Sequence, residues 1–150
     1  MIFHDELMFT DLAVTDRDEV LSTLGSAVIA QGYANSNYVS ALREREAEYP
    51  TGLAISGGVA IPHTAADFVT GNTIAVASLK NPVKFGAMGE GPDSLVDVSA
   101  VFMLVIADST QHVPFLSKLI RRLQKQDFVD AVRTADDKSA VSALLRETFS

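Results

Sequence analysis

Histidines are the residues of this chain whose type and position best suit covalent or acid–base chemistry. Only three are present, His4, His63 and His112, and there is no cysteine. An imidazole titrates near neutral pH, so it can act as a nucleophile, an acid or a base. Without cysteine, covalent chemistry would have to use histidine, a hydroxyl, an amine or a carboxylate. His63 and His112 are therefore the first candidates for a reactive site, whereas His4 is expected to be a solvated surface residue.

His63 follows a short apolar segment, 59–61, and a proline, Pro62. The proline biases the residue before it toward extended geometry, so a strand is expected to end just before the histidine. In open α/β sheets, ligand sites lie outside the carboxyl ends of strands. We expect His63 to be presented at such an edge by a stiff backbone. A surface histidine at a strand end, with no chemical task, remains the alternative from spacing alone.

His112 and Arg45 are two further candidate site residues. His112 directly precedes a helix predicted from Val113, and the free N–H groups of a helix N-terminus favour anions. Arg45 lies between Glu44 and Glu46 on a predicted helix, and arginine can bind phosphate through two parallel hydrogen bonds. The alternatives are a helix-entry histidine without a task and an arginine on a solvated, charged helix face.

Other kinds of site lack their sequence motifs. The glycine-rich segment 86–91 (GAMGEG) is not a dinucleotide-binding motif, and there is no Walker A sequence. Neither a His-Glu-x-x-His pair nor a Gly-x-Ser-x-Gly elbow is present, and the histidines are too few for a convincing zinc site. We therefore predict no metal and no cofactor. The net charge of −7 would repel nucleic acid and anionic membranes. No membrane span or signal peptide is recognised, which predicts a cytoplasmic protein.

The elements that would position these residues alternate between buried strands and amphipathic helices. The length predicts one domain, 1–150, and the alternation predicts an α/β fold: a three-layer sandwich with a mixed β-sheet flanked by helices. The predicted strands are 7–9, 59–61, 73–79 and 98–106, with a loop over 80–95 that holds a possible short strand at 83–85. The predicted helices run from an N-cap at Thr15 to a closing Gly32, and over 37–48, 113–125 (with Pro114 in its first turn), 128–133 and 138–148.

Three segments have the order and spacing of a known family. Residues 57–64 (GGVAIPHT) follow an Arg-Glu helix end at 43–46 (RERE), and residues 102–104 (FML) precede Gln111-His112 and an amphipathic helix. These motifs resemble the type-2 (fructose/mannitol/galactitol) enzyme IIA family of the bacterial sugar phosphotransferase system, and the resemblance covers essentially the whole chain. Residues 48–53 (EYPTGL) and 114–116 (PFL) look most like galactitol-type members. Thr64 departs from the glycine usual in mannitol and fructose types.

The resemblance implies a phosphoryl carrier with named roles. His63 would accept a phosphoryl group as a tele-phosphohistidine from the phosphohistidine carrier protein and pass it to a cysteine of enzyme IIB. That protein phosphorylates sugar entering through the membrane enzyme IIC. By position, His112 would assist transfer and Arg45 would stabilise charge. No metal or nucleotide would be needed, because positioning and charge stabilisation dominate phosphoryl transfer.

Two rival functions stay open at this point. Relatives of the family serve regulatory, nitrogen-type phosphotransfer. These relatives usually lack the second histidine, so His112 favours transport. The other rival is a non-catalytic binding module with structural histidines.

Overall fold

A five-stranded mixed sheet forms the centre of the computed structural model, which describes residues 1–90 and 93–149. The strand order is β1-β4-β5-β3-β2. β1 and β4 are parallel, β4 and β5 antiparallel, β5 and β3 parallel, and β3 and β2 antiparallel. The strands are β1 (Met8–Leu12), β2 (Gly52–Leu53), β3 (Val59–Ala60), β4 (Thr73–Gly86) and β5 (Leu95–Val105).

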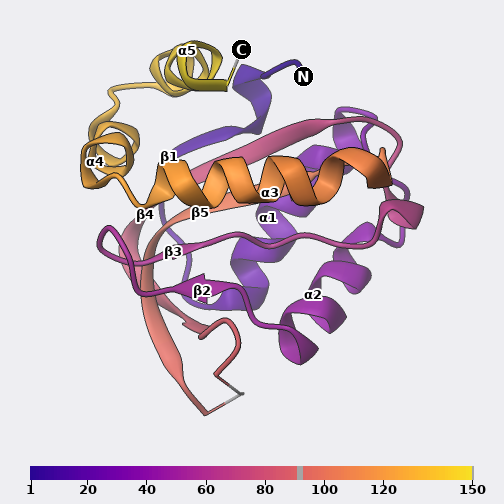
Figure 1. The fold of residues 1–150 in the computed structure, drawn as a ribbon, viewed down its shortest axis with the longest axis horizontal. Helices are drawn as coiled ribbons and strands as arrows, with labels where there is room; N and C mark the ends of the chain where they lie inside the picture. Colours follow the sequence, from indigo (N-terminus) through magenta and orange to yellow (C-terminus); the bar gives the residue numbers. More distant parts are fainter. Residues whose placement is uncertain (91–92, 150) are drawn as a thin grey trace.

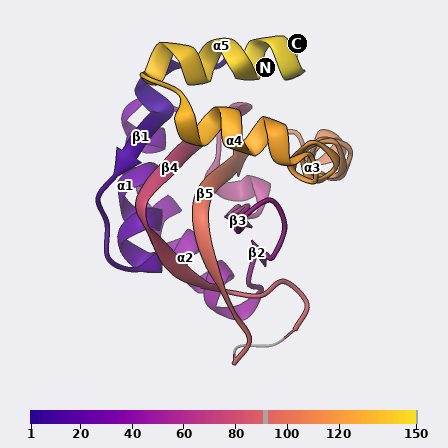
Figure 2. The same ribbon diagram turned by 90° about the vertical axis from the view of Figure 1, so that its left-hand side faces the viewer.

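Helices cover both faces of this sheet, which confirms the predicted three-layer arrangement (Figures 1 and 2). One layer holds α1 and α2, and the other holds α3, α4 and α5. Each layer has its own apolar core against the sheet. No helix in the described part of the chain is long and apolar enough to cross a membrane. The helices are α1 (Arg17–Ala30), α2 (Tyr38–Glu48), α3 (Ser109–Leu123), α4 (Gln126–Thr134) and α5 (Lys138–Phe149), with single 3-10 turns η1 (Asp5–Leu7) and η2 (Ala66–Phe68).

The predicted loop over 80–95 is wrong for its first part, because β4 continues to Gly86. Val83 and Phe85 are buried while Lys84 between them is exposed, which is the alternation of a half-buried strand. The possible strand at 83–85 is therefore confirmed. The ladder with β5 shifts register between Ser78 and Val83. Pro82, which has no N–H, therefore lies where no regular ladder hydrogen bond is required. Gly91 and Pro92 of the predicted loop lie outside the described residues.

The ends of α1 confirm one prediction and correct another. Gly32 has φ +82°, and Tyr33 N–H donates to the carbonyl of Val28, so the helix closes with the glycine motif that the sequence indicated. The N-cap, however, is Asp16 and not Thr15: the Asp16 carboxylate accepts from the N–H of Glu19. An ionised carboxylate also suits the positive end of the helix dipole.

Helix α3 begins four residues earlier than predicted, because its start carries polar side chains and no apolar periodicity. The N-cap is Asp108, whose carboxylate accepts from the N–H of Thr110. His112 therefore lies inside the helix and does not precede it. Pro114 is the sixth residue of α3 and not part of its first turn. Its missing N–H leaves the carbonyl of the exposed Thr110 to solvent.

The turn at Gly57-Gly58, just before β3, is tightly constrained. Gly58 has φ +93°, and a Cβ there would lie 1.9 Å from the carbonyl oxygen of Asp97. Only glycine fits so close an approach of two backbones. Arg133 of α4 holds the turn from outside, donating to Ser99 Oγ at 2.7 Å and to the carbonyl of Ser56. The turn thus fixes where β3, and the histidine after it, begin.

Candidate active site

His63 stands directly after β3, on a backbone tied to the sheet. The carbonyl of Pro62 accepts from Leu104 N–H of β5 at 3.0 Å. His63 Nδ1 lies 2.8 Å from the carbonyl oxygen of Ile61. A carbonyl oxygen only accepts, so Nδ1 carries the proton and the unprotonated nitrogen of the neutral ring is Nε2. The fold thus prepares one nitrogen of His63 for attack.

The structure brings the two candidate histidines together from distant elements. The ring centroids of His63 and His112 are 5.1 Å apart, in an edge-to-face arrangement with an interplanar angle of 61°. A histidine expected at a strand end and one expected at the start of a helix thus lie side by side. Their separation is short enough for a group bound to one ring to contact the other.

Both rings are biased toward the neutral form. Burial lowers the pKa of His63, and the nearby His112 and Arg45 lower that pKa further, although the bond to Ile61 opposes them. The pKa of His112 is also lowered, first by burial and then by Arg45. A neutral imidazole has a free lone pair, so the site contains a nucleophile at physiological pH.

A hollow of about 270 Å³ opens in front of the two rings. Arg45 of α2, exposed to solvent, is part of its wall. An anion bound here would meet two imidazoles and a guanidinium, which is a suitable environment for phosphate. The other lining residues are Thr64, Ala65, Ala66, Ser109 and Val113.

A second hollow, of about 430 Å³, also has His63 in its wall and is largely apolar. Arg45 borders this one too, and its guanidinium carbon lies 4.6 Å from the ring centroid of Tyr49. His63 and Arg45 therefore each border both hollows. The apolar walls include Pro50, Met88 and Leu116.

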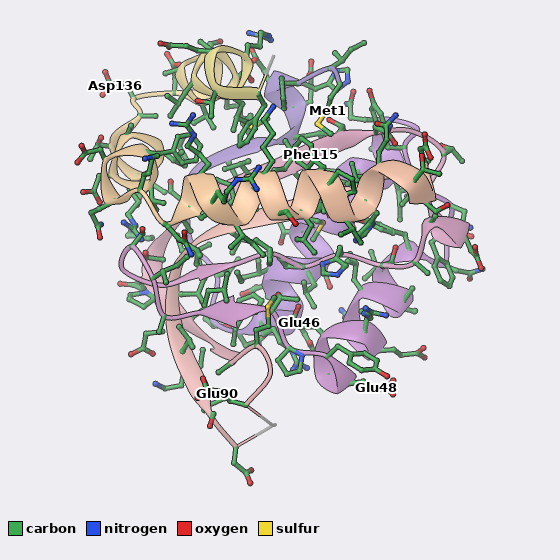
Figure 3. All side chains as sticks on the ribbon, in the orientation of Figure 1. Met1, Glu46, Glu48, Glu90, Phe115 and Asp136 are labelled. Carbon is green, nitrogen blue, oxygen red and sulfur yellow. The ribbon has the colours of Figure 1, made fainter. Side chains whose placement is uncertain are left out.

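Glu46 is a contributor to this region that sequence reasoning missed, since it was interpreted as part of a solvated charge run. Its side chain is 2% exposed, and its two oxygens accept from the N–H and the hydroxyl of Thr51 at 2.6 and 2.8 Å. Figure 3 labels Glu46 and its exposed neighbour Glu48 at the end of α2. The bridge ties that helix end, and so Arg45, to the segment leading into β2.

Asn72, before β4, is a second residue that the sequence did not reveal. Its side-chain oxygen accepts from Ala107 N–H at 2.8 Å, and its nitrogen lies 3.4 Å from Gln111 Oε1. These contacts hold the beginning of α3, and hence His112, against the sheet. Its only signal in the sequence is a polar residue next to a strand, which is too common to be informative.

Comparison with known families decides the identity of the fold and the class of protein. The family described as "Phosphoenolpyruvate-dependent sugar phosphotransferase system, EIIA 2" matches residues 1–148. This chain belongs to that EIIA family. The resemblance stated from the sequence motifs is thereby confirmed, and the protein is a phosphotransferase component.

Individual relatives support the EIIA assignment. The galactitol-specific EIIA component of Escherichia coli (strain K12) is 32% identical over 124 residues, 82% of this chain and 81% of that protein. Among solved structures, the complex of enzyme IIA-mannitol and phosphorylated enzyme IIB-mannitol from Escherichia coli matches with a TM-score of 0.78 at 20% identity, covering 97% of this chain and 99% of that chain. Nitrogen regulatory protein IIA-Ntr from Neisseria meningitidis matches with a TM-score of 0.74 at 26% identity, covering 96% of each chain.

All three residues predicted for the EIIA site lie around the same hollow. His4, in contrast, is half-buried and not a free surface residue: its Nε2 lies 2.5 Å from the hydroxyl of Tyr33. The described residues contain no group of three or more His, Cys, Asp or Glu placed to hold a metal.

Proposed function

We propose that this EIIA chain, acting as a single cytoplasmic domain, carries a phosphoryl group on Nε2 of His63. The donor is the phosphohistidine of the carrier protein: its N–P bond breaks as the Nε2 lone pair forms the new one. In the next step a cysteine thiolate of enzyme IIB attacks the phosphorus, and the Nε2 lone pair is restored. Enzyme IIB would then supply the membrane enzyme IIC.

The observation that carries this proposal is the hydrogen bond from His63 Nδ1 to the carbonyl of Ile61. It leaves Nε2 as the nucleophile, beside His112 and a hollow able to hold a phosphoryl group. His112 would donate a hydrogen bond to a phosphoryl oxygen, and Arg45 would stabilise charge as it spreads in the transition state. The protein supplies position and charge, which is what phosphoryl transfer demands.

A transport role is preferred to a regulatory one. The IIA-Ntr protein of Neisseria meningitidis shares the fold and 26% of its residues, so regulation is the second candidate. The second histidine, 5.1 Å from the first, favours a carrier built for onward transfer. A non-catalytic binding module is a weaker explanation, because nothing about mere binding requires two neutral imidazoles at one hollow.

The decisive experiment is reconstitution with phosphoenolpyruvate, its kinase and the phosphohistidine carrier protein. We expect an acid-labile, base-stable phosphoryl group on His63, and none on the His63→Ala variant. His4→Ala is the matched control, since His4 contacts Tyr33 and lines neither of the hollows beside His63. Uptake of phosphate by His63→Ala at the wild-type rate and extent would refute the proposal.

Galactitol-type specificity is the finer part of the proposal. It rests on the 32% identity to a galactitol-specific EIIA component and on residues 48–53 and 114–116, of which 48–51 and Leu116 border the apolar hollow. Phosphoryl transfer to purified galactitol-type and mannitol-type enzyme IIB separates the possibilities. We expect the former to be faster. Equal transfer rates to the two enzymes IIB would still support the carrier role but would contradict galactitol-type specificity.

A further inference from the structure

A row of basic side chains runs along the second half of α3 and into the turn after it, remote from the histidines. Lys118, Arg121 and Arg122 have the spacing i, i+3 and i+4, which places them on one side of the helix. Lys125 follows just after the helix ends, as the N-cap of α4. Helix α3 contains no acidic residue. The chain as a whole has 12 basic and 19 acidic residues, so this cluster of positive charge lies on a protein whose net charge is negative.

Two of these cations are held in place by aromatic rings. The ammonium nitrogen of Lys118 lies 5.9 Å from the ring centroid of Phe149, and the guanidinium carbon of Arg122 lies 6.0 Å from that of Phe128. Both rings are buried. Contacts of this kind orient a charged group without neutralising it. The positive groups are therefore partly preorganised.

All four basic residues line one hollow of about 240 Å³, which we call the basic hollow. Its other described lining residues are Thr148 and Phe149. Within residues 1–90 and 93–149, none of the four cations forms an ion pair. Within the helix, Lys118 repels Arg121 and Arg122, which lie three and four residues away, and the negative end of the helix dipole only partly offsets this repulsion. An anion in the hollow would remove that repulsion.

A larger hollow of about 770 Å³ adjoins it and shares Arg122, Lys125 and Thr148. Its walls differ in chemistry: they add the carboxylates of Asp127 and Glu147 together with an amide. Carboxylates and amides accept hydrogen bonds from hydroxyl groups but repel further negative charge. The pair of hollows thus offers one place for an anion next to one place for hydroxyl groups.

We propose that this surface binds a small phosphomonoester that carries several hydroxyl groups, such as a phosphorylated sugar or sugar alcohol. The phosphate would occupy the basic hollow, where guanidinium and ammonium groups donate to its oxygens. The hydroxyl groups would face Asp127 and Glu147. Those carboxylates disfavour an extended polyanion such as nucleic acid or an acidic peptide, because a second negative group would fall beside them.

This site is separate from the phosphoryl site. His112 and Arg122 are ten residues apart on α3, or about 15 Å along the helix axis. The inference does not depend on the proposed function, since it uses neither histidine. It assigns to the chain a second recognition surface, for the product class of sugar phosphorylation.

The test is calorimetric titration of the full chain with a hexitol 6-phosphate, in the His63→Ala background so that phosphate cannot bind at that ring. We expect a Kd of about 1 mM or tighter at low salt. The variant Arg121→Gln/Lys125→Gln should weaken binding at least about tenfold. Both side chains are exposed, so the fold is retained. Lys80→Gln, exposed on β4, is the control for general charge and should leave the Kd unchanged.

Comparison ligands make the outcome decisive. The unphosphorylated hexitol should bind undetectably, and inorganic phosphate more weakly than the hexitol phosphate. Amide chemical-shift changes should gather at 118–125 and 144–149. Equal binding of inorganic phosphate, equal weakening by Lys80→Gln, or tighter binding of an acidic peptide would each overturn the proposal. So would a titration with no heat and no shift changes at about 10 mM ligand.

Discussion

The side-chain oxygen of Asn72 accepts a hydrogen bond of 2.8 Å from the main-chain N–H of Ala107. It also lies 3.4 Å from the N–H of Asp108, the N-cap of α3. A residue before β4 thus holds the start of the helix that carries His112. Whatever His112 contributes to transfer depends on this contact for its position.

Asn72→Ala should therefore impair transfer by displacing His112. We expect a loss of about 1–2 kcal/mol in the free energy of unfolding, as for lost hydrogen bonds to main-chain groups, and transfer to enzyme IIB several-fold slower. Asn72→Asp keeps the accepting oxygen and should recover most of the rate. If Asn72 acts through His112, the double variant with His112→Ala is no slower than His112→Ala alone. Additive losses in rate would show a separate effect.

His112→Ala should still be phosphorylated on His63 but should pass the group to enzyme IIB much more slowly. A phosphoryl group on the neighbouring ring brings about two negative charges, which raise the pKa of His112 and make it a stronger donor. A donor that strengthens in the transition state affects rate more than extent. His112→Gln, which retains one donor, should recover part of the loss. Rapid-quench experiments measure the transfer rates of the wild type and both variants. A wild-type rate in His112→Ala would indicate that His112 has only a structural role.

The pH dependence of phosphate uptake should reflect the lowered pKa of His63. Protonation removes the Nε2 lone pair, so uptake should be constant above the ordinary value near 6.5 and fall only as pH drops through the lower folded-state pKa. The unfolded ring takes up its proton first, so stability declines as pH falls from the ordinary value near 6.5 to the lower folded-state pKa. Removing Arg45, one of the causes, should move the His63 titration to higher pH. An NMR titration of the Cε1 proton measures this, and an unmoved curve would contradict it.

Arg45→Ala should slow phosphoryl transfer about tenfold, less than the 10²–10³ typical of a positioned donor, because its side chain is exposed and screened. Arg43→Ala is the matched control from the same helix and should transfer normally, since Arg43 contacts Ser22 instead. Steady-state transfer with the carrier protein distinguishes the two. Identical kinetics in both variants would indicate that Arg45 is a solvated residue of α2 with no role in transfer.

Glu46 should make stability fall as pH rises. Burial raises the pKa of this carboxyl above its ordinary value, despite two hydrogen bonds from Thr51. The unfolded carboxyl therefore ionises first, and the stability present below its ordinary pKa is lost as pH rises through the folded pKa. Glu46→Gln keeps bonds to Thr51 and should remove this dependence. Urea unfolding at about pH 4 and about pH 7 tests it, with the exposed Glu48→Gln as the unaffected control.

The sequence indicated the layers of the fold well, because apolar periodicity is a local property. It predicted the helices to within a few residues and the buried parts of β4 and β5. The errors fall where a tertiary contact overrides local pattern. The strand after Lys80 exists because β5 pairs with it, and the polar start of α3 is held by Asp108 and Asn72.

The candidate site divides in the same way. His63 could be found because a proline and a strand end mark its position, and His112 because the apolar pattern of a helix begins at the next residue. Glu46 could not be found, because Glu44, Arg45 and Glu46 form one charged run on a helix. Only packing against Thr51 buries the last of them. Residues that position others leave no motif, because their partners are main-chain groups of distant segments.

The contact between His63 and Ile61 joins a side chain to a main-chain carbonyl, and this has a consequence for how the chain tolerates change. No substitution at position 61 can delete its carbonyl oxygen. Mutation of Ile61 therefore does not by itself change which nitrogen of His63 is unprotonated. What could disturb it is a change in backbone path, for example at Pro62 or Gly58. Sequence drift can therefore remodel the walls of both hollows, while the nitrogen of His63 that we propose carries the phosphoryl group stays the same.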